Sequence, residues 1–334
     1  MRRFLSAVAA LGMLAVAASS AAADTVLRIG TAVPQATPQG RALDMMAKLL
    51  SENGSGLELR IYHGGQLGAP DAQVQNVKIG AQDGFAEGLA MWETFSPSMG
   101  LASAPFVFDG REHLQRWLGS DYFDAVQKEI VEAGGQRLIV SDELWWRGPF
   151  RVMMATRPIL TLEDVATMKM RASSNAIMTR YWGPKGLGAN TINIAWNDTY
   201  LSLLQGVAES VTSPFDLVVS MRFVEVAKHV MLFDEYQTLV AIAMNEAKWQ
   251  SLTDEQRKAF NDAMTEAGKA YNAEVDQSVE KWMQELRDAG ATIHEFDRAP
   301  FVARVAELNR GYEKEGLIPA GLLDAVEALR QPAN

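Results

Sequence analysis

Cysteine is absent from the 334-residue sequence. Its absence excludes disulfides, thiol catalysis, thiolate metal sites and a lipid-modified amino-terminal cysteine. Histidine is scarce, and the four histidines, His63, His113, His229 and His294, lack the i, i+4 spacing of a helical zinc motif. We therefore expect surface or hydrogen-bonded histidines and no metal site.

Signatures of common enzymes and of nucleic-acid binding are also missing. The chain has no G-x-S-x-G nucleophile elbow and no P-loop lysine pattern, and the glycines at 186 and 188 are too few for a dinucleotide fingerprint. The formal net charge is −10 and no basic stripe stands out, so nucleic acid and anionic membranes are poor partners. These absences predict a protein that is not an enzyme and uses no cofactor.

The first 23 residues have the organisation of a secretory signal peptide. Arg2 and Arg3 give a positive start, residues 4–18 are an apolar run, and three alanines precede Asp24. A retained membrane anchor is the alternative, but the run is shorter than the roughly 20 apolar residues that span a bilayer. The sequence predicts export to the periplasm with cleavage near Ala23.

Strand and helix signals alternate through the rest of the chain. Strand signals include residues 26–30, 57–62, 84–87, 137–140 and 168–172, and helical patterns separate most of them. This alternation favours an α/β fold with a largely parallel sheet, and the length favours two domains. Further expectations are one helix over 111–132, a strand-like segment over 210–219, and an apolar run over 230–244 that crosses back to the first domain.

One very long helix is predicted near the carboxyl end. Thr253 to Gln256 form a capping box, and apolar residues then recur at spacings of three, four and seven up to Gly290. At 1.5 Å per residue this helix is roughly 50 Å long, which is longer than one small domain. We expect it to lie across two domains. A two-stranded coiled coil is the alternative, although strict heptads are missing.

The stretch from 145 to 175 carries the best candidate for ligand binding. It places Arg151 and Arg171 on two apolar runs that are separated by a turn at Pro158 and a short helix. An arginine at the end of an interior strand lies where ligands bind in open α/β sheets, and a guanidinium has paired donors that match a carboxylate. Arg171 is therefore a candidate carboxylate clamp. A partly exposed structural ion pair is the alternative.

Short motifs occur in a characteristic order along the chain: Gly-Gln-Leu-Gly at 65–68, Phe-Ala-Glu at 85–87, Ala-Pro-Phe-Val-Phe at 104–108, Arg-Pro-Ile at 157–159, Glu-Asp at 163–164, Lys-Met-Arg at 169–171, Tyr200, and Gln-Gly-Val at 205–207. With these motifs the chain resembles the extracytoplasmic solute-binding proteins of tripartite ATP-independent periplasmic (TRAP) transporters, the DctP-like family. The resemblance covers essentially everything after the signal peptide.

The resemblance implies a two-domain periplasmic binding protein-like α/β fold that closes on a ligand. The first domain is expected at residues 24–148, completed by about 239–275. The second is expected at 149–238, completed by about 276–334, with the long helix spanning both. A cleft between two domains is where small-molecule sites tend to lie.

The resemblance also implies site residues. The arginine matching Arg171 binds the ligand carboxylate in that family, the one matching Arg151 assists, an aromatic residue matching Trp196 packs on the ligand, and Glu87 matches a polar ligand-facing position. Ser213 stands where the family usually has asparagine, and its shorter side chain would leave space for ligand or water.

Tryptophan is the other candidate contact. Trp92, Trp145 and Trp146, like Trp196, fall near segments that should line the cleft, although most of them could equally be core. Glu87 beside these indoles could balance a ligand amine, which would make the ligand zwitterionic, or it could cap backbone donors.

Together these features predict a periplasmic receptor. It should capture a small organic carboxylate and deliver it to the small and large membrane subunits of a TRAP permease. We expect the ligand to be a compact acid with an apolar or cationic body rather than a plain dicarboxylate. A sensory partner of a signalling protein and, less favoured, a secreted enzyme acting on organic acids are the alternatives.

Overall fold

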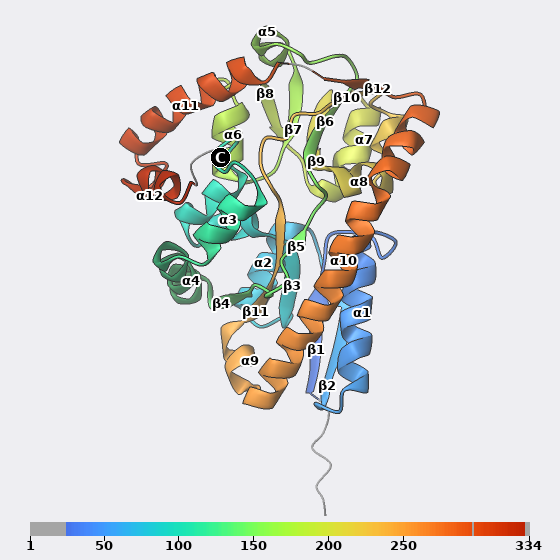
Figure 1. Cartoon of the computed structure of the whole chain (residues 1–334), viewed down its shortest axis with the longest axis vertical. Helices are drawn as coiled ribbons and strands as arrows, with labels where there is room; N and C mark the ends of the chain where they lie inside the picture. The colour runs from blue at the N-terminus through green and yellow to red at the C-terminus, as the bar shows by residue number, and fades with distance from the viewer. Residues whose placement is uncertain (1–24, 296, 331–334) are drawn as a thin grey trace, which may run out of the picture.

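The computed structural model describes residues 25–295 and 297–330, which form two sheets with helices packed around them (Figure 1). The first sheet has the strand order β2 (Leu57–Tyr62), β1 (Thr25–Gly30), β3 (Gly84–Gly88), β11 (Leu239–Asn245) and β4 (Gln136–Ile139), and β5 (Trp145–Trp146) also pairs with β11. The second has the order β12 (Thr292–His294), β10 (His229–Met231), β6 (Arg151–Ala155), β9 (Ser210–Pro214), β7 (Lys169–Ala172) and β8 (Asn190–Asn193). The predicted signal peptide lies outside the described residues.

Each sheet mixes parallel and antiparallel pairs. β1 is parallel to β2 and β3, and β7 is parallel to β8 and β9. β11 is antiparallel to its neighbours, and so is β6. The α/β class is therefore confirmed, but the expected largely parallel sheet is not found. β11 enters the first sheet directly from the second, so no crossover helix sets its direction.

Each sheet takes its strands from two separate stretches of the chain. Those of the first sheet come from residues 25–146 and 239–245, and those of the second from 151–231 and 292–294. The domain bounds, 24–148 with about 239–275 and 149–238 with about 276–334, stay a prediction.

The first sheet is flanked by α1 (Pro38–Glu52), α2 (Pro70–Lys78), the 3-10 helices η1 (Leu89–Thr94) and η2 (Pro97–Ser103), α3 (Arg111–Leu118), α4 (Asp121–Gly134) and α9 (Glu246–Ser251). The second is flanked by α5 (Leu162–Ala166), α6 (Ala176–Trp182), η3 (Trp196–Asp198), α7 (Thr199–Leu204), α8 (Phe215–Ser220) and η4 (Phe223–Glu225). The helix α10 (Asp254–Asp288) follows, and α11 (Ala299–Lys314) and α12 (Leu322–Ala328) close the described chain.

Two sequence expectations need correction. The helix expected over 111–132 is two helices, because the chain breaks at Gly119 and restarts after Ser120. The strand expected over 210–219 ends at Pro214, where the fixed φ of proline suits the start of a helix, and continues as α8. The apolar run over 230–244 overlaps β10 and β11, and the residues between these strands cross from the second sheet to the first, as expected.

Each sheet and its flanking helices form one layer of the molecule. The long helix lies across both layers, as predicted. The Thr253 side chain accepts a hydrogen bond from the backbone N–H of Gln256, so the capping box is present. Figure 1 shows α10 running beside α1 and on to α8. Within the chain, Trp145 donates its indole N–H to the carbonyl of Met264 at 2.9 Å, and Trp282 packs edge-on against Phe215 at 6.0 Å. The apolar stripe is thus covered by the protein's own core.

The carboxyl-terminal helices also connect the two layers. α11 lies against α6, where Tyr312 donates to the carbonyl of Arg180 at 2.7 Å. α12 lies against α3 of the first layer, where the carbonyl of Val326 is 2.8 Å from Nε2 of His113 and that of Leu329 accepts from Arg116 at 2.6 Å. The described residues from 299 to 330 therefore contact the first layer as well as the second.

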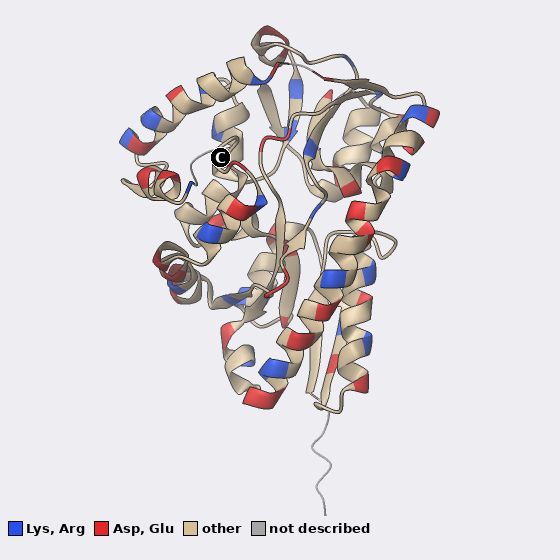
Figure 2. Ribbon diagram, viewed as in Figure 1, with Lys and Arg blue, Asp and Glu red and all other residues tan. Residues whose placement is uncertain are grey.

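Charged residues mark the exposed faces of the helices. Figure 2 shows acidic and basic residues interspersed along α1 and α10. Among the helices of the described residues, none is both long and apolar enough to cross a bilayer.

Substituting Gly268, in the middle of α10, tests the packing of the long helix. A Cβ atom at 268 would lie 2.5 Å from Nε1 of Trp145 and 2.9 Å from the carbonyl of Glu143, whereas at Gly311 in α11 it would meet open space. We expect Gly268→Ala to lower the free energy of unfolding by about 1–3 kcal/mol through overpacking. The matched Gly311→Ala should raise it by up to about 1 kcal/mol, because alanine favours helix. Urea unfolding measures both, and a more stable Gly268→Ala variant would contradict the packing.

Candidate ligand-binding site

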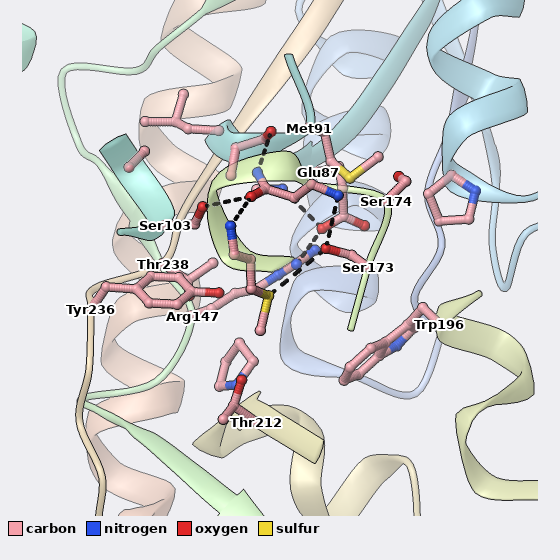
Figure 3. A pocket seen from close by; sticks show the side chains of 18 of the residues that line it. Glu87, Met91, Ser103, Arg147, Ser173, Ser174, Trp196, Thr212, Tyr236 and Thr238 are labelled. Carbon is pink, nitrogen blue, oxygen red and sulfur yellow. Dashed lines mark hydrogen bonds and ion pairs between the residues drawn. The ribbon is translucent and has the colours of Figure 1, made fainter. Parts of the chain in front are cut away.

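A cavity of about 380 Å³ lies between the two sheets and takes its wall from both (Figure 3). Glu87 and Leu239 come from β3 and β11 of the first sheet, and Arg151, Arg171 and Thr212 from β6, β7 and β9 of the second. Because both layers contribute, the cavity has the form expected of a site that closes around a ligand.

Arg171 lies in this wall with only 7% of its surface exposed. Its Nε donates to the carbonyl of Ile194 at 2.9 Å, and its guanidinium lies 5.2 Å from the centre of the Trp196 ring. No carboxylate of the described residues lies within ion-pair distance of it. Burial, together with the positive charge of Arg151, lowers the pKa of Arg171 to about 10, so it remains charged at neutral pH.

The surroundings of Arg171 argue against the alternative that it forms a structural ion pair within the protein. A guanidinium in a structural ion pair needs a protein carboxylate, and the described residues provide none there. A buried cation without a counter-charge is costly. An anion entering the cavity would remove that cost.

Arg151, at the start of β6, is already paired. Its Nε lies 3.1 Å from a carboxylate oxygen of Glu235, its terminal nitrogens donate to Thr212 at 3.2 Å and Thr238 at 3.0 Å, and its guanidinium lies 4.2 Å from the centre of the Tyr236 ring. The charge of Arg151 is therefore balanced within the protein, although the second N–H of each terminal nitrogen remains available to a ligand.

Arg147 was not identified from the sequence. It lines the cavity, forms an ion pair with Glu87, and donates from Nε to the side chain of Gln39 at 2.8 Å. Glu87 also accepts from the backbone N–H of Gly88 at 2.8 Å. Glu87 is thus in the wall, as predicted, but its charge is taken up by Arg147, which argues against its balancing a ligand amine.

Trp196 lies where the sequence predicts. It is half-buried in the wall, faces Arg171, and packs edge-on against Phe223 at 5.5 Å. It opens η3, two residues after Ile194, whose carbonyl accepts the hydrogen bond from Arg171. The guanidinium therefore lies over the indole ring at cation–π distance.

Four predicted contacts lie outside the wall of this cavity. Ser213 is fully buried and donates to the carbonyl of Pro214, because on β9 it points to the opposite side from Thr212 and Pro214, which do line the cavity. Trp92 donates to Gln136 at 2.9 Å and Trp145 to Met264, both fully buried. Trp146 lies under the guanidinium of Arg111 at 5.4 Å.

The physical reason is the same for the three tryptophans. Their large apolar surfaces pack in the cores beside the sheets, where they are removed from water. Their placement supports the alternative that they are core residues.

Hydrogen bonds join the two layers beside the cavity. Ser174 donates to Asp71 at 2.8 Å and Asn175 to the carbonyl of Ala90 at 3.3 Å. Glu93, on η1, accepts from the backbone N–H groups of Ala176 at 2.9 Å and Ile177 at 3.2 Å. These contacts, made by residues 174–177 of the second layer with the first, hold the layers together on one side of the cavity.

Comparison with known proteins identifies the family of the chain. Residues 29–315 match the family described as bacterial extracellular solute-binding protein, family 7 (DctP). The chain belongs to this family. The predicted resemblance is confirmed.

Relatives of this family-7 chain share its length and fold. The 2,3-diketo-L-gulonate-binding periplasmic protein YiaO of Escherichia coli is 27% identical over 322 residues, 96% of each chain. A TRAP periplasmic solute-binding protein of Polaromonas sp. JS666, bound to D-erythronate, superposes with a TM-score of 0.82 at 22% identity over 92% of this chain and 100% of that one. One from Chromohalobacter salexigens, with bound D-glucuronate, has a TM-score of 0.82 at 22% identity over 91% and 100%. The predicted two-domain binding-protein fold is confirmed.

Glu87→Gln tests the buried ion pair. The side chains of Glu87 and Arg147 are 9% and 7% exposed, so removing the carboxylate leaves a buried cation unpaired and should cost about 3 kcal/mol of stability. Glu58→Gln, in the exposed pair with Arg60, is the matched control and should leave stability almost unchanged. Denaturant titration measures the free energy of unfolding of both variants. Equal losses in the two variants would show that the pair of Glu87 and Arg147 is solvated.

Glu93→Gln tests the contacts between the layers. Burial raises the pKa of Glu93 from 4.5 to about 7. Between these values the folded protein keeps a proton that the unfolded chain has released, so this group's contribution to stability falls as the pH rises from 4.5 to 7. The difference in melting temperature between Glu93→Gln and the wild type should therefore shift in favour of the variant as the pH rises. The exposed Glu255→Gln is the control, and parallel pH curves for Glu93→Gln and wild type would refute the assignment.

Proposed function

We propose that this family-7 protein is a periplasmic receptor that captures a small organic carboxylate through Arg171 and delivers it to a TRAP-type permease. The observation that carries the proposal is the buried guanidinium of Arg171, which faces the cavity with no carboxylate of the described residues beside it. A ligand carboxylate would supply the missing counter-charge.

The geometry favours one mode of pairing. Because Nε already donates to the carbonyl of Ile194, the two terminal nitrogens remain for the ligand. They offer two near-parallel donors to the two oxygens of a carboxylate. The hydrogen bond to Ile194 and the contact with Trp196 restrain the guanidinium, so less freedom is lost when the ligand binds.

The relatives support the same ligand class. YiaO is named for 2,3-diketo-L-gulonate, and the two solved structures hold D-erythronate and D-glucuronate. Each of these molecules carries a carboxylate. Delivery to the permease is inferred from the family, and stimulation of substrate uptake by vesicles containing the permease subunits would test it.

Binding without chemical conversion is also part of the proposal. Arg147 and Arg151 hold Glu87 and Glu235 in ion pairs, so these acids are poorly placed to transfer protons to a ligand. Mass spectrometry of ligand recovered after incubation should show an unaltered molecule.

Arg171→Ala tests the clamp. The probe is whichever acid gives the largest thermal shift in a screen of organic acids with the wild-type protein. Losing one partner of a buried charge pair costs about 3–5 kcal/mol, so the affinity should fall by roughly two to three decades. Calorimetry should show a smaller loss for Arg171→Lys, which keeps the charge but not the paired donors.

Arg310→Ala, at an exposed position of α11, is the control for a general change in charge. It should bind as the wild type does. A loss of less than about fivefold in Arg171→Ala would refute the clamp.

A further inference from the structure

The charges around the cavity favour a ligand with a single negative charge. Among the described residues that line it, the charged ones are Arg147, Arg151, Arg171, Glu87 and Asp71. Glu87 neutralises Arg147, and Glu235, just behind the wall, neutralises Arg151. Asp71 is exposed to water at the rim and accepts from Ser174. One buried cation, Arg171, is left over in the described wall.

A second charge on the ligand would find no partner inside. A second carboxylate would lose its hydration in the cavity and would find no unpaired cation among the described residues there, and Asp71 would repel it. An ammonium group would meet only Glu87 among the buried lining carboxylates that the structure describes, and that acid is held by Arg147. Both dicarboxylates and zwitterions therefore pay a desolvation cost that a monocarboxylate avoids.

Most polar side chains of the wall already have partners within the protein. Thr212 and Thr238 accept from Arg151, and Ser103 donates to the carbonyl of Gly100 at 3.0 Å. The amide of Asn175 donates to Ala90 and accepts from the backbone N–H of Met178 at 2.6 Å. The indole N–H of Trp196 has no hydrogen-bond partner among the described residues, and Thr212 and Thr238 keep their own hydroxyl protons. A ligand rich in hydroxyl groups would still exchange water for few free partners, and an unsatisfied buried hydroxyl is costly.

The rest of the wall is apolar. It consists largely of small and aliphatic side chains, including Leu89, Met91, Ala102, Leu114, Met178 and Leu239. Figure 3 shows Met91 and Ser103 on the side of the cavity away from Trp196 and Thr212. A carboxylate at Arg171, beside Trp196, would therefore direct the body of the ligand toward the Met91 side.

From these observations we infer that the ligand is a monocarboxylic acid with a mainly apolar body. The inference rests on the proposed function, since it takes Arg171 as the carboxylate site. It departs from the hydroxyl-rich acids found in the two solved relatives, because most polar side chains of this cavity already have partners within the protein.

Four acids with one six-membered carbon ring isolate each part of the inference. Cyclohexanecarboxylate has one charge and an apolar body, trans-1,4-cyclohexanedicarboxylate adds a second carboxylate, trans-4-aminocyclohexanecarboxylate adds an ammonium group, and quinate adds hydroxyls. Calorimetry with the wild-type protein should show cyclohexanecarboxylate binding at least about fivefold more tightly than each of the others. A smaller preference over any one of them, or no binding of cyclohexanecarboxylate, would overturn the inference.

Met91→Gln tests the apolar wall directly. It keeps the length of the side chain but adds an amide, so it should weaken cyclohexanecarboxylate by about fivefold and narrow its advantage over quinate. Met45→Gln, on the exposed face of α1 and outside the cavity, is the control and should change neither affinity. Unchanged selectivity in a Met91→Gln variant with wild-type melting temperature would overturn the placement of the apolar body.

Arg171→Ala separates this inference from the proposed function. If the tightest acid loses affinity in Arg171→Ala but is quinate, the dicarboxylate or the amino acid of the panel, the receptor function stands and the inference on ligand class fails. If the tightest acid binds equally well to Arg171→Ala, the carboxylate clamp itself fails.

Discussion

The cavity depends on an imbalance of charge among three arginines. Their guanidiniums share one wall, and each positive charge disfavours the others, as the effect of Arg151 on Arg171 shows. Glu87 and Glu235 relieve that repulsion at Arg147 and Arg151 and so fix these two side chains as structural parts of the wall. Arg171 alone is left for an external anion within the described site. The protein's own ion pairs thereby determine which arginine is free to bind.

That arrangement depends in turn on the crossing between the two sheets. Glu235 and Thr238, which hold Arg151, lie between β10 and β11. The crossing is held by the backbone N–H of Phe106, which donates to the carbonyl of Glu235 at 2.6 Å. Phe106 and Asp234 have positive φ values of 58° and 45°, a conformation that non-glycine residues adopt at a cost when surrounding contacts enforce it. Local strain here is consistent with a segment shaped for the site rather than for its own stability.

The sequence predicted those parts of the site that local rules determine. The position of Arg171 follows from its place on an interior strand, and the long helix follows from its capping box and apolar spacing. Ser213 was misplaced because a shift of one residue along β9 turns a side chain to the other face of the sheet. Arg147 was missed because its partners, Glu87 and Gln39, come from distant segments that only the folded chain brings together. Trp196 lies in the wall, whereas Trp92, Trp145 and Trp146 lie in the cores, and composition alone does not distinguish these two locations.

The candidate clamp and the contacts between the two layers lie on one continuous stretch of chain. Arg171 is three residues before Ser174, and residues 174–177 make the hydrogen bonds to Asp71, Ala90 and Glu93 of the first layer. Asn175 caps the helix α6 that begins there. Because α6 packs against the carboxyl-terminal helix α11 through Tyr181 and Tyr312, whose rings meet edge-on at 5.0 Å, the far end of this segment is anchored in the second layer. If an anion displaced Arg171, the displacement would therefore have to be absorbed within this short segment or passed to the contacts between the layers.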